Sequence, residues 1–483
     1  MRNGFVMDME AIIGLEIHVQ LNSPTKMFCD CPNRPGDRPN LNTCPVCLWL
    51  PGTFPVLSRD VLERAAMTCL ALHCEIQPVS AFDQKVYYYP DLPKGFQLSQ
   101  FHKPLARDGW VEVSDGKKSS KRIRIREIHL EEDVAKLVHE MEGKKQISLV
   151  DFNRAGAPLI EIVTEPDMRS PQEAMEFLRK LRSQIRYVGG AECSMERGTM
   201  RADANISLRP RDTDEFNTKV EIKNMNSIRH VGDAITCEME RQKNQLKAGE
   251  IIVLHTRLWD AAKGVTSPMR AKFSGPCVPD PSVAEIEISP EWLDEMRGRL
   301  PEMPDPKRDR FVEEYGLTKE EATLMSEERE VAEYFEVLAK QIPSPRTAAH
   351  WMSEQILPAI RERGQDPRET PVTPSRVAEL LRLIDSGELN AQSAKEVLLR
   401  LFDSDLSPNE IVEQAGLKQV TDQTELEGIV DRLVAENPDA VEDYRNGKKK
   451  AIGFLVGQAM RLSGGKADPK GVKDIIEKKL SSL

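Results

Sequence analysis

The sequence contains no hydrophobic run long enough to cross a membrane: none approaches the roughly 20 apolar residues that span a bilayer. Its first residues, MRNGFVMDMEAIIGLEI, also lack the apolar segment and the small-residue cleavage site of a secretory signal. The phosphate-binding loop G-x-x-x-x-G-K-S/T, the dinucleotide glycine fingerprint and the G-x-S-x-G nucleophile elbow are missing too. We therefore expect a cytoplasmic protein without a membrane partner, and we do not expect a P-loop ATPase, a Rossmann dehydrogenase or an α/β-hydrolase.

A cysteine pattern typical of a disulfide framework and a net positive charge are also lacking. Nine cysteines, an odd number with four closely clustered, fit reduced thiols or a metal site better than a disulfide framework. The net charge of −11 excludes a bulk polycation, so a nucleic-acid partner must be bound by a local basic surface. The last 43 residues carry ten Lys or Arg against five Asp or Glu. This surplus is typical of a solvated helical surface, and contact with nucleic acid is the alternative.

The 483 residues suggest about three domains, with ample length to bury a core. Residues 1–294 contain strand-like stretches such as KRIRIREIHL and KVEIKNMN, interrupted by helical patterns. Beyond them the patterns are helical and are separated by short Pro/Gly loops. We therefore predict an α+β fold: a large mixed β-sheet cradle domain over 1–294, an all-α helical domain over 295–405 and a small helical tail over 406–483.

The stretch GLEIHVQL, residues 14–21, alternates with the period of a β-strand. Its odd-numbered residues are apolar, and Glu16 and His18 stand side by side on the polar face. A polar strand face is most often simply solvated. The alternative is that Glu16 and His18 form half of a metal or catalytic site.

Glu161 is informative because it lies inside the apolar run PLIEIV. A buried carboxylate is costly without a cation, so either a structural Arg or Lys neutralises Glu161 or a metal binds it. Further polar side chains stand in strand-like context: His129, Glu131, Glu132, Asp133, Glu165, Asp203, Asn205, Glu221, Lys223, Asn224 and Asn226. Together they indicate an oxygen-rich site suited to Mg²⁺, which favours carboxylates and water.

Four cysteines form a separate signal. Cys29 and Cys31 are followed after twelve residues by Cys44 and Cys47. Four thiolates in two close pairs suit tetrahedral Zn²⁺, and because no open coordination position is evident, such a zinc would be structural. The alternative is that the four thiols are close by chance, since a C-x-C pair is tighter than the usual C-x-x-C.

The stretch KVYYYPDLPKGFQLSQF, residues 85–101, is the third signal. Three consecutive tyrosines and several polar residues around prolines describe a rigid loop whose aromatic faces can stack a base or an adenosine. A proline-anchored core loop with buried tyrosines is the alternative.

Several strings of this chain, in this order, resemble one protein family over nearly the whole length. IGLEIHVQL, YYYPDLPKGFQLSQF, HLEEDVAKLVH, LVDFNRAGAPLIEIVTEPD, RADANISLR, KVEIKNMNS and GFLVGQAMR are similar to motifs of the B subunit of the aspartyl/glutamyl-tRNA(Asn/Gln) amidotransferase. The archaeal glutamyl-specific E subunit is a relative, but this chain shows no obvious large insertion in its second half.

The resemblance implies a two-step ligase reaction on misacylated tRNA. ATP, with Mg²⁺, phosphorylates the side-chain carboxylate of tRNA-bound Glu or Asp, and ammonia then displaces phosphate to give the amide. In the implied heterotrimer, a glutaminase A subunit sends ammonia through an internal channel, with Glu132 and Asp133 near its exit, and a small C subunit holds the pair together. The competing hypothesis is a noncatalytic tRNA-binding scaffold whose partner does all the chemistry.

The resemblance also implies roles for single residues. Glu16 and His18 line the kinase site and help to hold Mg²⁺, and Glu131 and Glu161 are its further ligands. Lys94 is the fifth catalytic candidate and helps to frame the ATP and aminoacyl pocket. The remaining residues of that pocket are expected to be Tyr88, Asp91, Gln97, Asp203, Asn205, Lys223 and Asn224.

One segment departs from the family. FSGPCVPDPSVAE, residues 273–285, stands where the family usually has an Asp-Tyr-Arg-Tyr-Phe-Pro run, so roles tied to that run are not carried over and Cys277 is unexplained. In the tail, the resemblance favours recognition of the tRNA elbow. Gly453 and Gly457, one helical turn apart, allow close approach of another helix or of an RNA backbone. The candidate phosphate contacts are Lys448, Lys449, Lys450 and Lys466.

Overall fold

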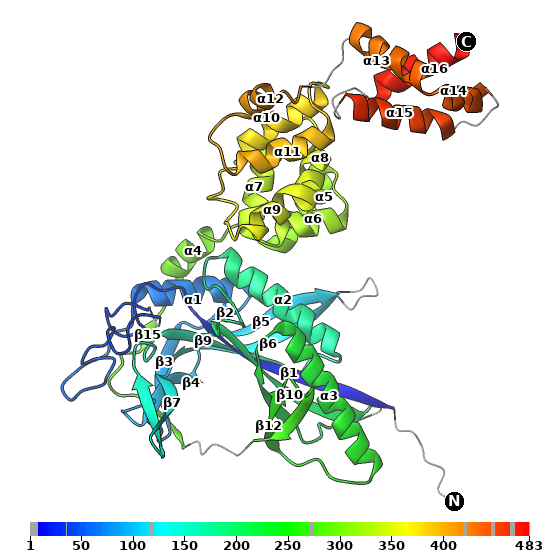
Figure 1. The fold of residues 1–483 in the computed structure, drawn as a ribbon. Helices are drawn as coiled ribbons and strands as arrows, with labels where there is room; N and C mark the ends of the chain where they lie inside the picture. Colours follow the sequence, from blue (N-terminus) through cyan, green and yellow to red (C-terminus); the bar gives the residue numbers. More distant parts are fainter. Residues whose placement is uncertain are drawn as a thin grey trace, which may run out of the picture. The chain divides into compact units, whose positions relative to one another are not determined.

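The computed structural model describes residues 8–34, 36–114, 120–211, 213–269, 275–418, 423–445, 450–463 and 469–482 (Figure 1). The chain divides into two compact units, Met1–Met303 and Pro304–Leu483. A large mixed β-sheet forms the centre of the first unit, and the described part of the second unit is helical. The α+β prediction is therefore confirmed, whereas the domain boundaries expected at residues 294 and 405 stay predictions.

The large sheet has nine strands in the order β13-β12-β11-β10-β1-β9-β6-β5-β2. Neighbouring strands are antiparallel except β11 and β12, which run parallel. The strands are β1 Met9–Gln20, β2 Glu75–Ile76, β5 Ala106–Ser114, β6 Ser120–Glu132, β9 Pro158–Thr164, β10 Met200–Pro210, β11 Val220–Met225, β12 His255–Asp260 and β13 Val265–Pro268. The strand predicted from GLEIHVQL is thus the central strand of the sheet.

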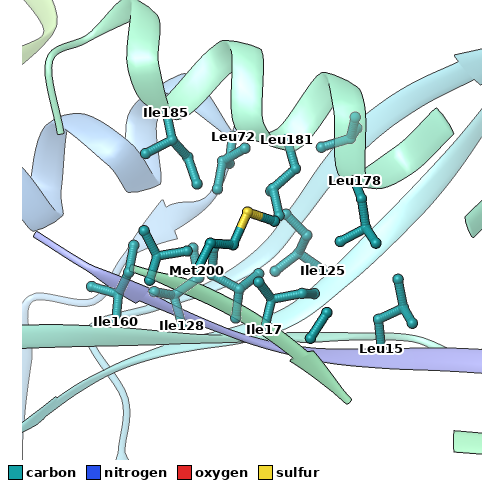
Figure 2. Close-up of a cluster of buried hydrophobic side chains, with 14 of the residues drawn as sticks. Leu15, Ile17, Leu72, Ile125, Ile128, Ile160, Leu178, Leu181, Ile185 and Met200 are labelled. Carbon is teal, nitrogen blue, oxygen red and sulfur yellow. The ribbon is translucent and has the colours of Figure 1, made fainter. Parts of the chain in front are cut away.

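Helices cover one face of this sheet (Figure 1): α1 Arg59–Ala71, α2 Pro171–Tyr187 and α3 Ile228–Lys247. Figure 2 shows Leu181 of α2 in the same buried cluster as Ile17 of β1. Pro171 opens α2, and Ser170 caps it by accepting a hydrogen bond from the backbone N–H of Glu173. Since successive strand residues point to opposite faces, the polar residues that alternate with this core lie on the face without helices.

A second, smaller sheet lies against the end of β6. It has the order β14-β3-β15, with β4 also paired to β3. Its strands are β3 Val79–Val86, β4 Phe96–Lys103, β14 Cys277–Pro279 and β15 Ile286–Glu287. Side-chain to backbone hydrogen bonds join β4 to β6: the Leu98 N–H donates to Glu132 Oε1 and the Leu130 N–H donates to Gln100 Oε1. A two-stranded hairpin, β7 Lys136–Glu142 with β8 Lys145–Asp151, follows β6.

Helix α4, Pro290–Gly298, is the last described element of the first unit. The helices of the second unit are α5 Pro304–Tyr315, α6 Lys319–Ser326, α7 Arg329–Ala339, α8 Pro345–Trp351, the π-helix η1 Met352–Ile356, α9 Leu357–Glu362, α10 Pro374–Asp385, α11 Ala391–Leu401, α12 Pro408–Ala415, α13 Gln423–Glu436, α14 Pro438–Arg445, α15 Lys450–Leu462 and α16 Pro469–Ser482. A capping box opens α6, because Thr318 and Glu321 exchange side-chain to backbone hydrogen bonds. Within the described ranges, no helix has both the length and the apolar character needed to cross a membrane.

The last helices of the chain, α13 to α16, pack around a hydrophobic cluster of their own. The buried members of this cluster are Leu426, Val430, Leu433, Val441, Leu455, Ala459, Val472, Ile476 and Leu480. A separate core at this end of the chain is what a small helical tail needs in order to fold as a compact piece.

Candidate functional site

Strand register places one row of polar side chains across the open face of the large sheet. His18 of β1 is the cross-strand partner of Arg201 on β10 and of Glu161 on β9. Glu161 is in turn the partner of His129 on β6. Directly paired residues of antiparallel strands point to the same side, so these four side chains form one row. Glu16, two residues before His18, stands in the next row on the same face.

A β-bulge turns the end of β6 toward this row. Ile125 and Ile128 are both buried under the helices, and Figure 2 shows them in one cluster, so the inward alternation changes from odd to even positions between them. The pairing with β9 shifts register between Ile125 and Glu127. The extra residue directs His129 and Glu131 to the open face, as bulges beside functional sites often do.

Four predicted residues meet in a carboxylate cluster, which comprises Glu16, His18, Glu131 and Glu161. His18 Nε2 lies 3.6 Å from Glu131 Oε2 and 3.8 Å from Glu161 Oε1. Ligand atoms of Glu16, His18 and Glu161 lie within 4.8 Å of one another. The polar face of GLEIHVQL is therefore built into a cluster and is not simply a solvated strand face.

The three carboxyl groups of the cluster differ in the direction of their pKa shifts. Burial raises the pKa of Glu161 to about 10, and the charges of Glu131 and Glu16 act in the same direction. For Glu131, burial also raises the pKa, but the contact with His18 and the charge of Lys85 outweigh burial and hold it below its usual range. The charge of Glu131 therefore favours the protonated form of Glu161 over its ionised form.

Lys85 was missed by sequence reasoning. Its Nζ lies 3.9 Å from Glu131 Oε1, and the charge of Glu131 raises the pKa of the Lys85 ammonium although burial opposes the shift. Cys277, in the divergent segment, pairs with Lys85 across β14 and β3 and so lies beside the cluster. Residues 273 and 274 of that segment lie outside the described part of the chain. The position of Lys85 just before the three tyrosines was the available signal.

The donor set fits a divalent cation that prefers oxygen ligands. Glu131 is buried, and its Oε1 has no hydrogen-bond partner among the described residues. Buried polar atoms are seldom left unpaired, and an ion is one common explanation. The three carboxylates and the one imidazole of the carboxylate cluster are suitable ligands for Mg²⁺ or Mn²⁺.

The predicted pocket residues from the tyrosine loop lie in different environments. The Lys94 side chain is only 6% exposed, bonds to the Glu132 carboxylate and lies 4.3 Å from the centre of the Trp49 ring. Gln97 bridges toward the cluster, since its Nε2 donates to Glu132 O at 2.8 Å and to Glu131 Oε2 at 3.3 Å. Tyr88 is 80% exposed, as a residue that stacks a ligand would be.

The loop also contacts the segment between β6 and β7. The Asp91 carbonyl accepts a hydrogen bond from the Ala135 N–H at 3.2 Å. Asp133 is buried and contacts Arg154 at 3.4 Å and Arg201 at 3.5 Å.

The candidates on β10 and β11 form a second polar group beside the cluster. Lys223 Nζ lies 2.6 Å from Asp203 Oδ2, and Asp203 is the cross-strand partner of Glu16. Asn205 lies one position further along the same face of β10. Asn224 has a positive φ of 73°, and its Nδ2 donates to Trp259 O at 3.1 Å, so its side chain supports the end of β11.

The four clustered cysteines are close enough to bind one metal ion, because their sulfur atoms lie within 4.8 Å of one another. A hydrogen bond from Cys29 lowers the pKa of Cys47 to about 5, and the charge of Lys26 acts in the same direction. Lys26 is fully buried, with Nζ 3.6 Å from Cys47 Sγ and 3.0 Å from Phe152 O. No local pattern predicted this lysine, which is a counter-charge to the thiolates.

In the tail, Lys448, Lys449 and Lys466 lie outside the described residues, and Lys450 is the first residue of α15. A Cβ added at Gly453 or Gly457 of α15 would meet nothing within 4 Å. The glycine pair therefore lies on a surface that the described part of the chain leaves open.

Two known protein families match this chain. The GatB/GatE catalytic domain matches residues 11–294, which hold both clusters, and the GatB domain matches residues 333–480. The chain belongs to the GatB/GatE family. The aspartyl/glutamyl-tRNA(Asn/Gln) amidotransferase B subunit 1 of Syntrophus aciditrophicus is 61% identical over 99% of this chain and 100% of its own length. The GatB relationship expected from the motifs is therefore confirmed.

Two more distant GatB relatives also match over nearly the whole length of both chains. The B subunits of Carboxydothermus hydrogenoformans and Persephonella marina, with the same amidotransferase name, are 46% and 44% identical. Each match covers 98% of this chain, and 99% and 100% of the respective relative. Their names describe one subunit of an amidotransferase that acts on aspartyl- or glutamyl-tRNA.

Proposed function

We propose that this chain uses ATP to phosphorylate the side-chain carboxylate of misacylated Glu-tRNA or Asp-tRNA and then amidates it. The carboxylate cluster on the open face of the sheet is the observation that carries the proposal. Family membership and the names of the relatives support the same reaction class. The ammonia would come from glutamine through a partner glutaminase A subunit, with a small C subunit completing a heterotrimer.

The first step joins the substrate carboxylate oxygen to the γ-phosphorus of ATP and breaks the bond to ADP. In the second step the ammonia nitrogen bonds to the acyl carbon, phosphate leaves with its oxygen, and the nitrogen loses a proton. Phosphoryl transfer needs positioning and neutralisation of charge more than covalent help from the protein. Lys85 supplies a cation at the cluster, and the exposed Tyr88, three residues further on, offers a stacking surface.

Glu16, His18, Glu131 and Glu161 would hold Mg²⁺. When bound, the ion supplies electrostatic stabilisation of the charge that develops on the transferred phosphoryl group. His18 contacts both Glu131 and Glu161 and so fixes the two carboxylates relative to each other. Asp203, held by Lys223, borders Glu16 on the next strand.

A noncatalytic scaffold for tRNA is the competing function. A binding surface has no need for three carboxylates gathered beside one imidazole, and burying like charges costs several kcal/mol per ion unless they are compensated. The cluster therefore favours a kinase role over a scaffold role.

For the cysteine cluster we propose a structural Zn²⁺ held by Cys29, Cys31, Cys44 and Cys47. All four sulfurs are used as ligands, which leaves no position for a substrate. The contact of Lys26 with both Cys47 and the Phe152 carbonyl ties this site to the segment before β9.

For the tail we propose binding to tRNA through the face of α15 that carries Gly453 and Gly457. RNA helices are recognised mostly by shape and backbone contacts, and two open glycines let a backbone approach closely. The proposed phosphate contacts are Lys450, the first residue of this helix, and the residues Lys448, Lys449 and Lys466, which are close to it in the sequence.

Deleting residues 406–483 is expected to raise the KM for misacylated tRNA and to flatten its salt dependence. Each lost phosphate contact lowers the slope of log K against log salt by roughly 0.7 to 0.9. The kcat at saturating tRNA should change less, because the carboxylate cluster lies wholly in the first unit. Steady-state kinetics of the assembled complex over a range of salt concentrations measure both quantities. An unchanged salt slope with lower thermal stability would show that the tail only packs against the rest of the protein.

A point-substitution pair tests the same face without truncation. Changing Gly453 and Gly457 to Glu should raise the KM for tRNA several-fold, because the new charges repel phosphates. Gly428 of α13 is the matched control, since a Cβ there also meets nothing within 4 Å. Glu is a better helix former than Gly, so all these variants should keep their helices.

A further inference from the structure

We propose that His129 is a positioning residue that orients Glu161 within the carboxylate cluster. The inference rests on the proposed function, because it assigns the outer support of a proposed Mg²⁺ ligand. It concerns a residue that touches neither the substrate nor the ion in the proposed arrangement.

Glu161 lies between two imidazoles that come from the two flanking strands. His18 on β1 and His129 on β6 are both its direct cross-strand partners. The two oxygens of the carboxylate are divided between them: Oε1 lies 3.8 Å from His18 Nε2, and Oε2 lies 3.6 Å from His129 Nδ1. One oxygen therefore faces the cluster while the other faces His129.

His129 is itself held from the far side. Its Nε2 lies 3.5 Å from Glu127 Oε1, and its side chain is only 7% exposed. The β-bulge between Ile125 and Glu127 places Glu127 on the same face as His129, two residues away. Three side chains thus form a line that ends at the carboxylate cluster: Glu127, then His129, then Glu161.

His129 lies outside the group whose ligand atoms gather within 4.8 Å, which contains Glu16, His18 and Glu161. Its Nε2 is buried and forms no hydrogen bond within the described part of the chain, so the 3.5 Å approach to Glu127 is an electrostatic contact. A buried ring in contact with a carboxylate at each nitrogen restricts the rotation of Glu161. Outer partners of this kind orient metal ligands, and their loss typically weakens metal binding by roughly 10- to 100-fold.

The test is a titration of the full-length protein with Mn²⁺, followed by electron paramagnetic resonance, in the wild type and in His129→Ala. We expect the Kd for Mn²⁺ to rise roughly 10- to 100-fold in His129→Ala. His129→Asn should recover much of the affinity, because its amide can still donate a hydrogen bond to Glu161. His139→Ala is the matched control, since His139 lies on the β7–β8 hairpin and contacts Ser148 at 2.8 Å.

In the assembled complex, the Mg²⁺ concentration for half-maximal amidation should rise in parallel with the Kd, while kcat at saturating Mg²⁺ recovers. Wild-type Mn²⁺ affinity in a folded His129→Ala would overturn the inference. Equal losses in His129→Ala and His129→Asn, together with lower thermal stability, would also overturn it, because they indicate a packing role alone. If Glu16→Gln loses Mn²⁺ binding while His129→Ala keeps it, the proposed function survives and this inference fails. If the wild type binds no Mn²⁺, both fail.

Discussion

Glu16→Gln is expected to abolish ATP-dependent amide formation by the assembled complex while glutamine hydrolysis by the partner glutaminase continues. Glu16 gathers with His18 and Glu161 within 4.8 Å, on the open face of the central strand. Gln keeps the size of the side chain but removes its charge, so the cluster loses an anionic ligand. Losing such a ligand should cost several kcal/mol of transition-state stabilisation, which corresponds to at least about a 100-fold lower rate.

His18→Ala should have an effect of the same size, because His18 contacts both Glu131 and Glu161. Glu10→Gln is the matched control: Glu10 lies nearer the start of the same strand and pairs with Arg209 at 2.8 Å, away from the cluster. Rates of amide formation on misacylated tRNA, measured beside glutaminase activity, give the comparison. Near-normal amide formation in Glu16→Gln or His18→Ala would contradict the assignment.

Cys44→Ser is expected to remove the metal from the cysteine cluster and to destabilise the first unit. The wild type should contain about one Zn²⁺ per chain, as a closed four-thiolate site requires. Structural zinc sites contribute roughly 10 kcal/mol or more of binding free energy in small zinc domains, so losing one ligand should have a large effect. Lys26 should increase the loss of stability, because its ammonium would remain buried beside an incomplete set of thiolates.

Elemental analysis and thermal unfolding measure the two effects of Cys44→Ser. Cys237 of α3 lies outside the cluster and is half-buried, so Cys237→Ser should keep its zinc and serves as the control. Amidation should fall with stability and not through a specific loss of kcat. A metal-free wild type with four reactive thiols in this region would contradict the proposal of a zinc site.

Single strands could be predicted from the sequence because their patterns are local. Alternation over GLEIHVQL identified β1, its apolar face and the polar residues that join the cluster. The caps of α2 and α6 likewise join residues only three positions apart in the sequence. These features depend on neighbouring residues, and they can be read without knowing which strands pair.

The rows across the sheet could not be derived in this way, because register between strands depends on long-range pairing. Nothing local shows that Glu161 is the partner of both His18 and His129. The bulge in β6 is indicated by the sequence, because the spacing from Ile125 to Ile128 breaks the strict alternation of KRIRIREIHL. The contact between Lys85 and Glu131 could not be predicted for another reason. The strand of Lys85 belongs to the second sheet, and Lys85 reaches Glu131 only because that sheet packs against β6.

Lys94 shows the limit of transferring roles by resemblance. The structure places it in a buried pair with Glu132 under Trp49, whereas its catalytic role stays a prediction. A buried pair of this kind can hold the loop in place without meeting the substrate.

The most direct test of the kinase assignment is ADP formation from ATP by the assembled complex, with misacylated Glu-tRNA or Asp-tRNA present and glutamine omitted. Without an ammonia source, only the phosphorylation step can proceed. We predict tRNA-dependent ADP formation by the wild type and none by Glu16→Gln, although both complexes bind the tRNA equally well. ADP formation at the wild-type rate in Glu16→Gln would contradict the account and would favour a scaffold whose partner performs the chemistry.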